Sequence, residues 1–205
     1  MSILPPEIVA RVPVSSAELA QLEGNAPLAV KRRVLQYVRT AKLVQGTYGA
    51  AAGLQLEPLS LSRTTSSSSA PHDDGSRVPR LQMVCGLRVS AEMLAPGENT
   101  LSLGFAAYLL DHTSTYPMLG QAFASGRTDD YFGVSQCLQM LFYASAPLGT
   151  LLRIESSAIA LGSRSLVCRS EIWDSDRSRL VCSAVHVKMS RSTASPPNKS
   201  ALAKL

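Results

Sequence analysis

The segment 103–117, LGFAAYLLDHTSTYP, constrains the fold of this chain more than any other part of the sequence. Alanine and leucine dominate it, which predicts a helix that starts near Ser102 and packs inside the protein. One carboxylate, Asp111, lies about two turns after that start. A buried, ionised carboxylate costs several kcal/mol unless a partner compensates for it. We therefore expect Asp111 to have a structural partner or a chemical role.

Four strand-like segments follow this helix and extend almost to the C-terminus. They cover residues 133–144, 150–161, 164–174 and 180–189. The first segment has apolar side chains on both faces, so we expect both of its faces to be covered. The segments between the strands are short and contain Gly, Pro, Asp or Ser, which predicts hairpins between consecutive strands.

The residues before the central helix predict one amphipathic helix and two strands. Apolar residues recur at helical spacing over residues 29–44, with basic side chains between them. Residues 54–63 and 80–90 predict a hairpin, and the Ser-rich, Pro-rich connection between them, residues 64–79, predicts a flexible insertion. Pro117 is expected to bend or end the central helix, and the alternative is that residues 118–124 continue it after a kink.

These patterns divide the chain into three parts. Residues 1–27 form an N-terminal arm, residues 28–190 form one α+β domain, and residues 191–205 form a disordered tail. Hydrophobic residues make up 45% of the 205 residues and charged residues 17%, which is typical of a globular domain with a substantial core.

Composition and motifs argue against several classes of protein. The net charge is +5, but the basic residues are scattered, and no zinc-finger spacing, aromatic–basic interleaving or P-loop is present, so we expect no nucleic-acid partner. No apolar run reaches the ~18 residues that span a bilayer. We also expect no metal and no cofactor. The four cysteines lie far apart in strand-like segments and predict small buried hydrophobes in a reducing compartment: Cys85, Cys137, Cys168 and Cys182.

The chain ends in Ala203, Lys204 and Leu205. The C-terminal tripeptide Ser-Lys-Leu is a peroxisomal address that an import receptor recognises, and Ala in place of Ser exchanges one small residue for another. The polar tail before it is expected to leave the signal accessible. We therefore predict a peroxisomal location, with the cytoplasm or the mitochondrion as the alternative.

Three stretches carry a resemblance to a known family. They are residues 104–115 in the central helix, residues 133–149 in the strand after it, and residues 162–188 in the last two strands. Their order and spacing resemble the hotdog fold, in which an antiparallel sheet wraps a long central helix. Within that superfamily, the motifs are similar to those of small acyl-CoA thioesterases, including the 4-hydroxybenzoyl-CoA type.

The resemblance implies a site, a substrate and an assembly. Asp111 matches the helix carboxylate that acts as general base or nucleophile, and Ser135 matches the serine that assists it. Gly104 matches a glycine whose backbone N–H, at the N-terminus of a partner's helix, stabilises the oxyanion. The substrate would be an acyl-CoA, and the active sites would lie between subunits of a homodimer or tetramer.

The sequence departs from the family where the oxyanion donors lie. The family has His-Gly-Gly before the helix, whereas this chain has Ser102, Leu103 and Gly104, and Pro96 replaces an upstream polar residue. The backbone N–H groups of Leu103 and Gly104 are still able to donate. Loss of an oxyanion donor lowers rates by ~10²–10³.

Further residues are candidates for binding substrate. Three basic side chains near strand ends are expected to contact the CoA phosphates: Arg164, His186 and Lys188. Three apolar or aromatic residues are expected to contact the substrate: Leu103, Tyr108 and Tyr143.

The leading hypothesis is a peroxisomal hydrolase that converts acyl-CoA to free acid and CoA. The missing His-Gly-Gly favours a second hypothesis, a non-hydrolytic acyl-CoA-binding or structural hotdog protein. A third hypothesis is a thioester-processing enzyme of specialised lipid or polyketide biosynthesis, such as a dehydratase that uses a helix histidine. His112 follows Asp111 directly, but adjacent helix positions face different directions. The pattern leaves open the acyl chain length, the pathway, the choice between dimer and tetramer, and whether catalysis survives the departure at Ser102 and Leu103.

Overall fold

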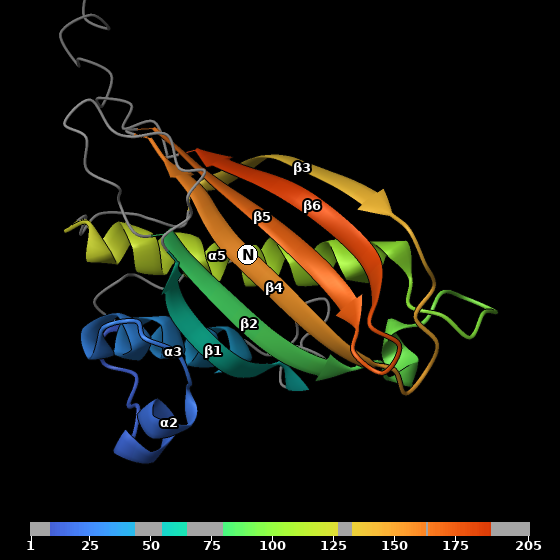
Figure 1. The fold of residues 1–205 in the computed structure, drawn as a ribbon, viewed down its shortest axis with the longest axis horizontal. Coiled ribbons are helices and arrows are strands. Elements are labelled where there is room, and N and C mark those ends of the chain that lie inside the picture. The colour runs from blue at the N-terminus through green and yellow to red at the C-terminus, as the bar shows by residue number, and fades with distance from the viewer. Residues whose placement is uncertain (1–8, 44–54, 65–79, 127–132, 163, 190–205) are drawn as a thin grey trace, which may run out of the picture.

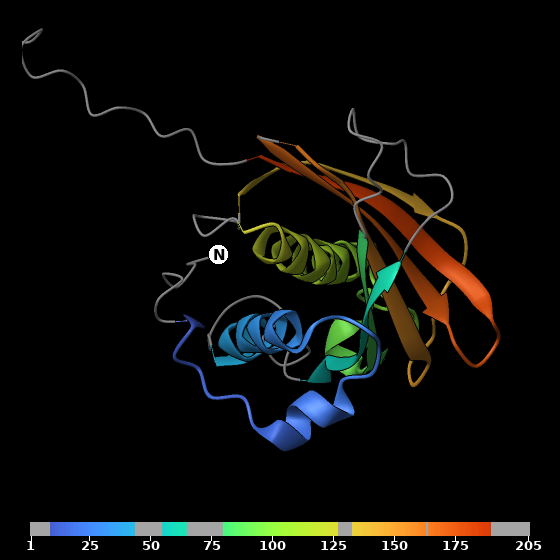
Figure 2. The same cartoon turned by 60° about the vertical axis from the view of Figure 1, so that its left-hand side comes forward.

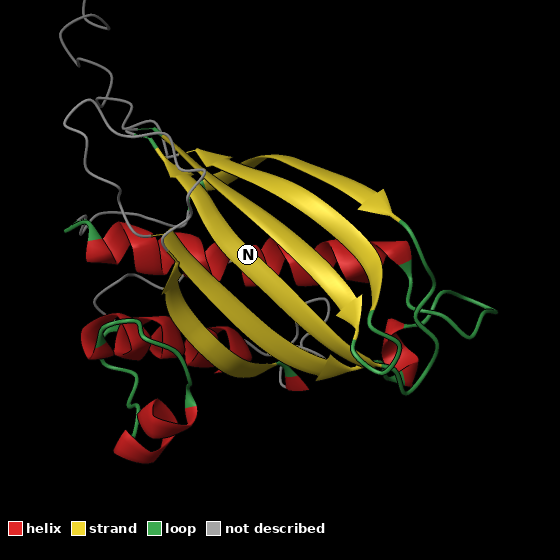
Figure 3. Cartoon of the chain, in the orientation of Figure 1, coloured by secondary structure: helices red, strands yellow, loops and turns green. Residues whose placement is uncertain are grey.

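The computed structural model describes residues 9–43, 55–64, 80–126, 133–162 and 164–189. Within them, one antiparallel sheet in the order β1-β2-β4-β5-β6-β3 curves around a long helix, α5 (Figures 1 and 3). The helices are α2 (Ser16–Gln21), α3 (Leu28–Leu43), the short 3₁₀ helix η1 (Ala91–Met93) and α5 (Leu103–Ala124). The strands are β1 (Glu57–Thr64), β2 (Arg80–Arg88), β3 (Val134–Phe142), β4 (Leu151–Leu161), β5 (Ser165–Asp174) and β6 (Arg179–Met189).

Helix α5 forms the centre of the domain, as the apolar segment predicts. The hydroxyl of Ser102 caps its start by accepting a hydrogen bond from the N–H of Phe105 at 3.0 Å. The helix continues past Pro117 to Ala124, which agrees with the alternative of a continued helix and not with an end at Pro117. Most of its side chains are buried against the inner face of the sheet and against α3. This packing supplies the stability that Pro117 removes from the helix backbone.

The order of the strands corrects two sequence-based expectations about β3. Strand β3 pairs with β6 and not with β4, so the segment 143–150 is a crossover, whereas β4, β5 and β6 are consecutive neighbours in the sheet. The predicted coverage of both faces of β3 is also wrong for the single chain, because β3 is the edge strand and most of its residues are exposed. Its apolar composition therefore leaves Val134, Leu141 and Phe142 in contact with solvent.

Helix α3 lies beside α5 on the side that the sheet leaves open (Figure 2). Its bounds agree with the amphipathic pattern within one residue. The N-terminal segment packs against α3, where the Gln36 amide donates to the carbonyl oxygens of Ala10 and Val12. The described part of this segment is therefore attached to the domain.

The cysteines differ in environment. Three of them are buried, as predicted, but Cys137 is exposed because β3 lies at the sheet edge. Most of the predicted flexible insertion and all of the predicted tail after residue 190 lie outside the described residues.

Gly133 sets the entry of the chain into β3. Its φ is +53°, and a Cβ there would lie 2.5 Å from the carbonyl oxygen of Met189. Backbone is less able to move away than a flexible side chain, so we expect Gly133→Ala to lower the free energy of unfolding by about 2 kcal/mol or more. Chemical denaturation measures this loss. The matched control is Gly97→Ala, which also has a positive φ (+77°) but whose Cβ would contact nothing within 4 Å. An equal loss in both variants would contradict the role assigned to the Met189 contact.

Candidate active site

Three side chains meet between α5 and the β3–β6 edge of the sheet. The hydroxyl of Ser135 on β3 donates to Oδ1 of Asp111 on α5 at 3.0 Å. Nε2 of His186 on β6 lies 3.0 Å from the Ser135 hydroxyl and 3.3 Å from the same Asp111 oxygen. The structure therefore brings the predicted pair Asp111 and Ser135 into contact, and it adds an imidazole to them.

A second layer of polar groups supports this cluster from α5 and β6. The Ser114 hydroxyl lies 2.6 Å from Nδ1 of His186, and the Thr115 hydroxyl donates to the backbone carbonyl of Asp111 at 2.8 Å. The ammonium group of Lys188 donates to the Thr115 hydroxyl at 2.8 Å. One turn of α5 and two inward positions of β6 thus form one continuous polar network.

The exposure of the cluster is uneven. The imidazole of His186 is fully buried, and Lys188 is 7% exposed. The side chain of Asp111, by contrast, is 45% exposed, so the expectation that it is buried is wrong for the single chain. The open side follows from the position of β3 at the sheet edge, next to this part of α5. A half-exposed carboxylate is accessible to water and to a ligand.

Burial and charge determine the protonation of the two basic groups. Burial, followed by the positive charge of Lys188, lowers the pKa of His186 from 6.5 to about 4, and the negative charge of Asp111 opposes this shift. Burial also lowers the pKa of Lys188, again against the charge of Asp111. His186 is therefore a neutral imidazole at neutral pH, which interacts by hydrogen bonding and not as a cation.

The lowered pKa of His186 predicts a pH-dependent stability. Between pH 6.5 and about 4 the unfolded chain binds a proton at this residue and the folded chain does not, so acid favours unfolding. We expect the free energy of unfolding to fall across this window, by at most about 3 kcal/mol from this residue. Denaturation curves at several pH values measure it. The His186→Gln variant should show a shallower fall, because its side chain does not titrate there. Equal slopes for the two proteins would contradict the assigned pKa.

The predicted oxyanion donors lie at the N-terminus of α5, about two turns before Asp111. Leu103 and Gly104 are exposed in the first turn, where backbone N–H groups have no partner within the helix. Gly104 precedes Asp111 by seven residues, which corresponds to about 10 Å along the helix axis. Within one chain, these donors are therefore too far from Asp111 to act on the same carbonyl group.

An apolar cavity of about 240 Å³ lies beside the start of α5. Its lining includes Leu103 and Ala106 of the helix, together with Phe142 and Tyr143 at the end of β3. Two of the predicted substrate contacts, Leu103 and Tyr143, therefore lie together at the helix start. The Tyr143 hydroxyl lies 3.0 Å from that of Ser183.

The remaining predicted residues lie apart from this cluster. Tyr108 stacks on His112 of the next turn, with ring centroids 5.6 Å apart, and His112 contacts Tyr116 edge-on. Burial is the main cause that lowers the pKa of His112. Arg164 is exposed in the β4–β5 connection. The predicted targeting residues at 203–205 lie outside the described residues.

His186 and Lys188 occupy positions that differ from the surface locations expected of phosphate contacts. Both point inward from β6 toward α5, where a CoA phosphate would have to displace buried hydrogen bonds. The sequence contains a signal for this orientation, because side chains two apart in a strand share a face. Cys182 and Ala184 belong to the same alternating set and are buried hydrophobes.

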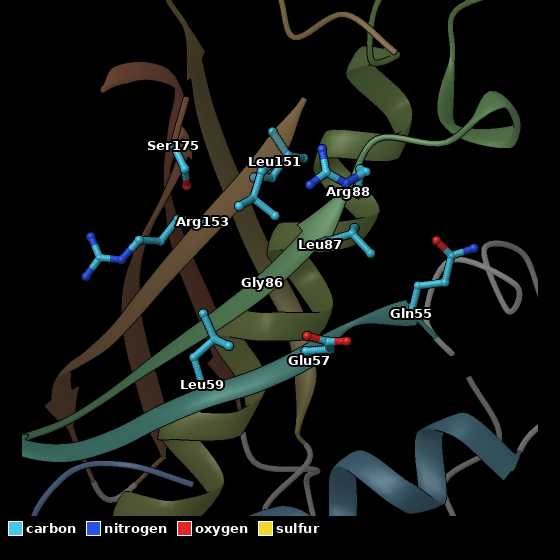
Figure 4. Close-up of a pocket in the computed structure, with 10 residues that line it drawn as sticks. Gln55, Glu57, Leu59, Gly86, Leu87, Arg88, Leu151, Arg153 and Ser175 are labelled. Atoms are coloured by element: carbon cyan, nitrogen blue, oxygen red, sulfur yellow. The ribbon is translucent and has the colours of Figure 1, made fainter. Parts of the chain in front are cut away.

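A separate cavity of about 560 Å³ lies on the outer face of the sheet (Figure 4). It is lined by residues of β1, β2 and β4, and Arg88, Arg153 and Leu59 are among them. It contains none of the predicted site residues. Among the described residues, no three His, Cys, Asp or Glu side chains are grouped so that they could hold a metal ion.

Solved structures provide the comparison with known proteins. The thioesterase superfamily member 2 of zebrafish is 20% identical with a TM-score of 0.57, covering 77% of this chain and 95% of that protein. The mouse thioesterase superfamily member 2 is 18% identical with a TM-score of 0.54, covering 75% and 95%. A putative thioesterase from Lactococcus lactis is 18% identical with a TM-score of 0.51, covering 66% and 93%. No family model and no curated protein sequence matches the chain.

The architecture and these similarities confirm the predicted α+β hotdog fold, with an antiparallel sheet around a long central helix. The similar structures belong to the thioesterase superfamily, at identities that establish the fold alone. No helix in the described part of the chain is long and apolar enough to cross a membrane.

Proposed function

We propose that this protein is a thioester hydrolase that converts acyl-CoA to a free acid and CoA. The observation that carries the proposal is the contact of the half-exposed Asp111 carboxylate with the Ser135 hydroxyl, on the central helix of a hotdog fold. A thioester is an activated acyl group, and its hydrolysis needs a base for water and donors for the oxyanion. The site supplies the first of these within one chain.

In the proposed reaction, Asp111 accepts a proton from a water molecule while the water oxygen attacks the thioester carbonyl carbon. The carbonyl oxygen becomes an oxyanion, and backbone N–H groups at a helix N-terminus stabilise it. The intermediate collapses as the C–S bond breaks and the thiolate of CoA leaves. The proton held by Asp111 is then returned to the products, which are the acid and free CoA. Ser135 donates to Asp111 and thereby orients the carboxylate.

The proposed mechanism requires a second copy of the chain. Because Gly104 and Asp111 lie about 10 Å apart along α5, the mechanism takes its oxyanion donors from the α5 of a partner. The apolar surface at the β3 edge supports such a dimer, because the side chains of Leu103, Leu141 and Phe142 are 62%, 57% and 42% exposed in the single chain. Edge strands also carry unpaired backbone groups that pair readily with another strand.

The start of α5 still offers backbone N–H donors, which the missing His-Gly-Gly motif would supply in the family. Ser102 caps the helix by accepting from Phe105 N–H, which leaves the N–H groups of Leu103 and Gly104 to donate. The absence of the motif also favours a second candidate function, acyl-CoA binding without hydrolysis. Titration calorimetry that detects binding of an acyl-CoA to a protein without turnover would support this second candidate.

The test of the proposal is a panel of acyl-CoA esters of increasing chain length, with free CoA measured chromatographically. Chromatography is preferable to a thiol reagent because Cys137 is exposed and would itself react. Release of CoA that is saturable in ester and proportional to protein concentration supports the proposal. Absence of release across the panel would contradict it.

We also propose a peroxisomal location, based on Ala203, Lys204 and Leu205 at the C-terminus. A hydrolase of acyl-CoA would there act on the substrates of fatty acid oxidation. A fluorescent protein fused in front of the whole chain should accumulate in peroxisomes, and the same fusion without the last three residues should not. Identical distributions of the two fusions would contradict the location.

A further inference from the structure

His186 is a buried side chain to which the proposed reaction gives no role. It is 0% exposed, and its two ring nitrogens contact side chains from different elements, Ser114 of α5 on one side and Ser135 of β3 on the other. Nε2 also lies 3.3 Å from Oδ1 of Asp111. A histidine with both nitrogens engaged is held in one orientation, and this one is held against the carboxylate of the site.

Electrostatics determines which nitrogen carries the proton. If Nε2 presented its lone pair, two acceptors, Nε2 and the ionised Oδ1 of Asp111, would face each other at 3.3 Å. With the proton on Nε2, that N–H points toward Ser135 and Asp111. Nδ1 then accepts from the Ser114 hydroxyl at 2.6 Å, which is a shorter contact than the 3.2 Å between this hydroxyl and the Asp111 backbone carbonyl. Ser135 then donates its own proton to Asp111 at 3.0 Å. The Nε2–H of His186 and the hydroxyl of Ser135 are then both directed toward Oδ1 of Asp111.

Burial, followed by the positive charge of Lys188, keeps the ring neutral. Asp111 faces it from α5 and Lys188 from β6, and burial together with Lys188 outweighs Asp111, so that the pKa of His186 is about 4. A neutral ring with its proton on Nε2 donates a hydrogen bond to the Asp111 carboxylate. It does not accept a proton at that nitrogen. The same arrangement argues against His186 as a base that activates Ser135, because that role needs the Nε2 lone pair.

We propose that His186 is a positioning residue: Ser114 orients its ring, and the ring N–H and the Ser135 hydroxyl together hold Oδ1 of Asp111. In the described residues, the side-chain contacts of Asp111 all fall on Oδ1, which leaves Oδ2 for the substrate water. This inference deepens the proposed function and rests on it, since it gives His186 its purpose through Asp111. A misplacement of about 1 Å in a reacting group can lower a rate ~10²-fold.

The first test compares two substitutions of the same residue. His186→Leu removes both ring nitrogens, and we expect kcat for acyl-CoA hydrolysis to fall ~30–100-fold, with KM changed less than ~3-fold. His186→Gln places an amide N–H near the position of Nε2, and we expect it to restore at least ~10-fold of that loss. Thermal unfolding of both variants shows whether they are folded. A folded His186→Leu variant that turns over like the wild type would overturn the inference.

The second test does not depend on turnover. The chain contains three histidines, so ¹⁵N-labelled histidine gives few signals, and the His186→Gln variant assigns the signal of His186. We expect the wild-type ring at pH 7 to be neutral with its proton on Nε2. We expect Ser114→Ala, which removes the Nδ1 partner, to reduce the population of this tautomer. A wild-type ring protonated on Nδ1 would overturn the inference even if hydrolysis is observed.

The two tests separate this inference from the proposed function. If no acyl-CoA is hydrolysed by the wild type, the proposed function fails, and the NMR measurement alone decides whether His186 donates to Asp111. If the wild type hydrolyses acyl-CoA and the Asp111→Asn variant does not, while His186→Leu retains full kcat, the proposed function stands and the role of His186 fails.

Discussion

Asp111→Asn is expected to lower kcat for acyl-CoA hydrolysis by ~10³-fold while the protein remains folded. General base catalysis typically contributes ~10²–10⁴ to a rate, and an amide does not accept the proton of the attacking water. Asn has the same shape as Asp, so it still accepts from Ser135, and the helix keeps the backbone contacts of this turn. Steady-state kinetics, combined with a thermal unfolding curve, measure the effect.

The matched control is Glu23→Gln, which removes an exposed carboxylate far from α5 in the chain. We expect it to leave kcat within ~2-fold of the wild type. Turnover by Asp111→Asn at the wild-type rate would reject Asp111 as the base and, with it, the proposed mechanism. Binding of acyl-CoA by this variant, measured by calorimetry, should persist because Asp111 acts on water and not on the CoA moiety.

Leu103→Asp is expected to dissociate the proposed dimer into monomers and to abolish hydrolysis with it. Leu103 is the first residue of α5, its side chain is 62% exposed, and it lies beside Phe142 and Tyr143 at the end of the edge strand. A carboxylate buried there without a partner costs about 3 kcal/mol or more, which corresponds to a ~10²-fold weaker dimer. Sedimentation velocity across a concentration series measures the shift.

Leu28→Asp provides a closely matched control for this substitution. Leu28 is the first residue of α3 and its side chain is 61% exposed, so the new carboxylate has the same favourable position at a helix N-terminus in both variants. Helix α3 lies away from β3 in the fold (Figure 1). We expect the Leu28→Asp variant to sediment like the wild type. If the Leu103→Asp variant is still a dimer, the start of α5 is not part of the interface. In that case the partner's N–H groups do not take part in the mechanism.

Local patterns were sufficient to predict the elements and part of the site. The apolar composition of the central segment predicted α5, and two-residue alternation predicted the strands with bounds close to those observed. The resemblance added the pairing of Asp111 with Ser135, which the structure places 3.0 Å apart. The contact of His186 with the Asp111 carboxylate was missed.

Several of the misses share one cause, which is the order of strands in the sheet. The prediction of hairpins placed β3 beside β4, but the chain crosses over and β3 becomes the edge strand next to β6. This single difference accounts for the exposure of Cys137 and for the open side of Asp111. It also places His186 of β6 close enough to Ser135 of β3 to interact.

The sequence by itself determined which segments are helix or strand, and which of their residues share a face, because these depend on periodicity within a few neighbouring residues. Only the tertiary structure decided that His186 meets Ser114, which lies 72 positions earlier in the chain, and that both belong to the network of Asp111. Such contacts depend on which strands pair. That choice is made by the packing of the whole sheet around α5 and leaves no signature in the spacing of any one segment.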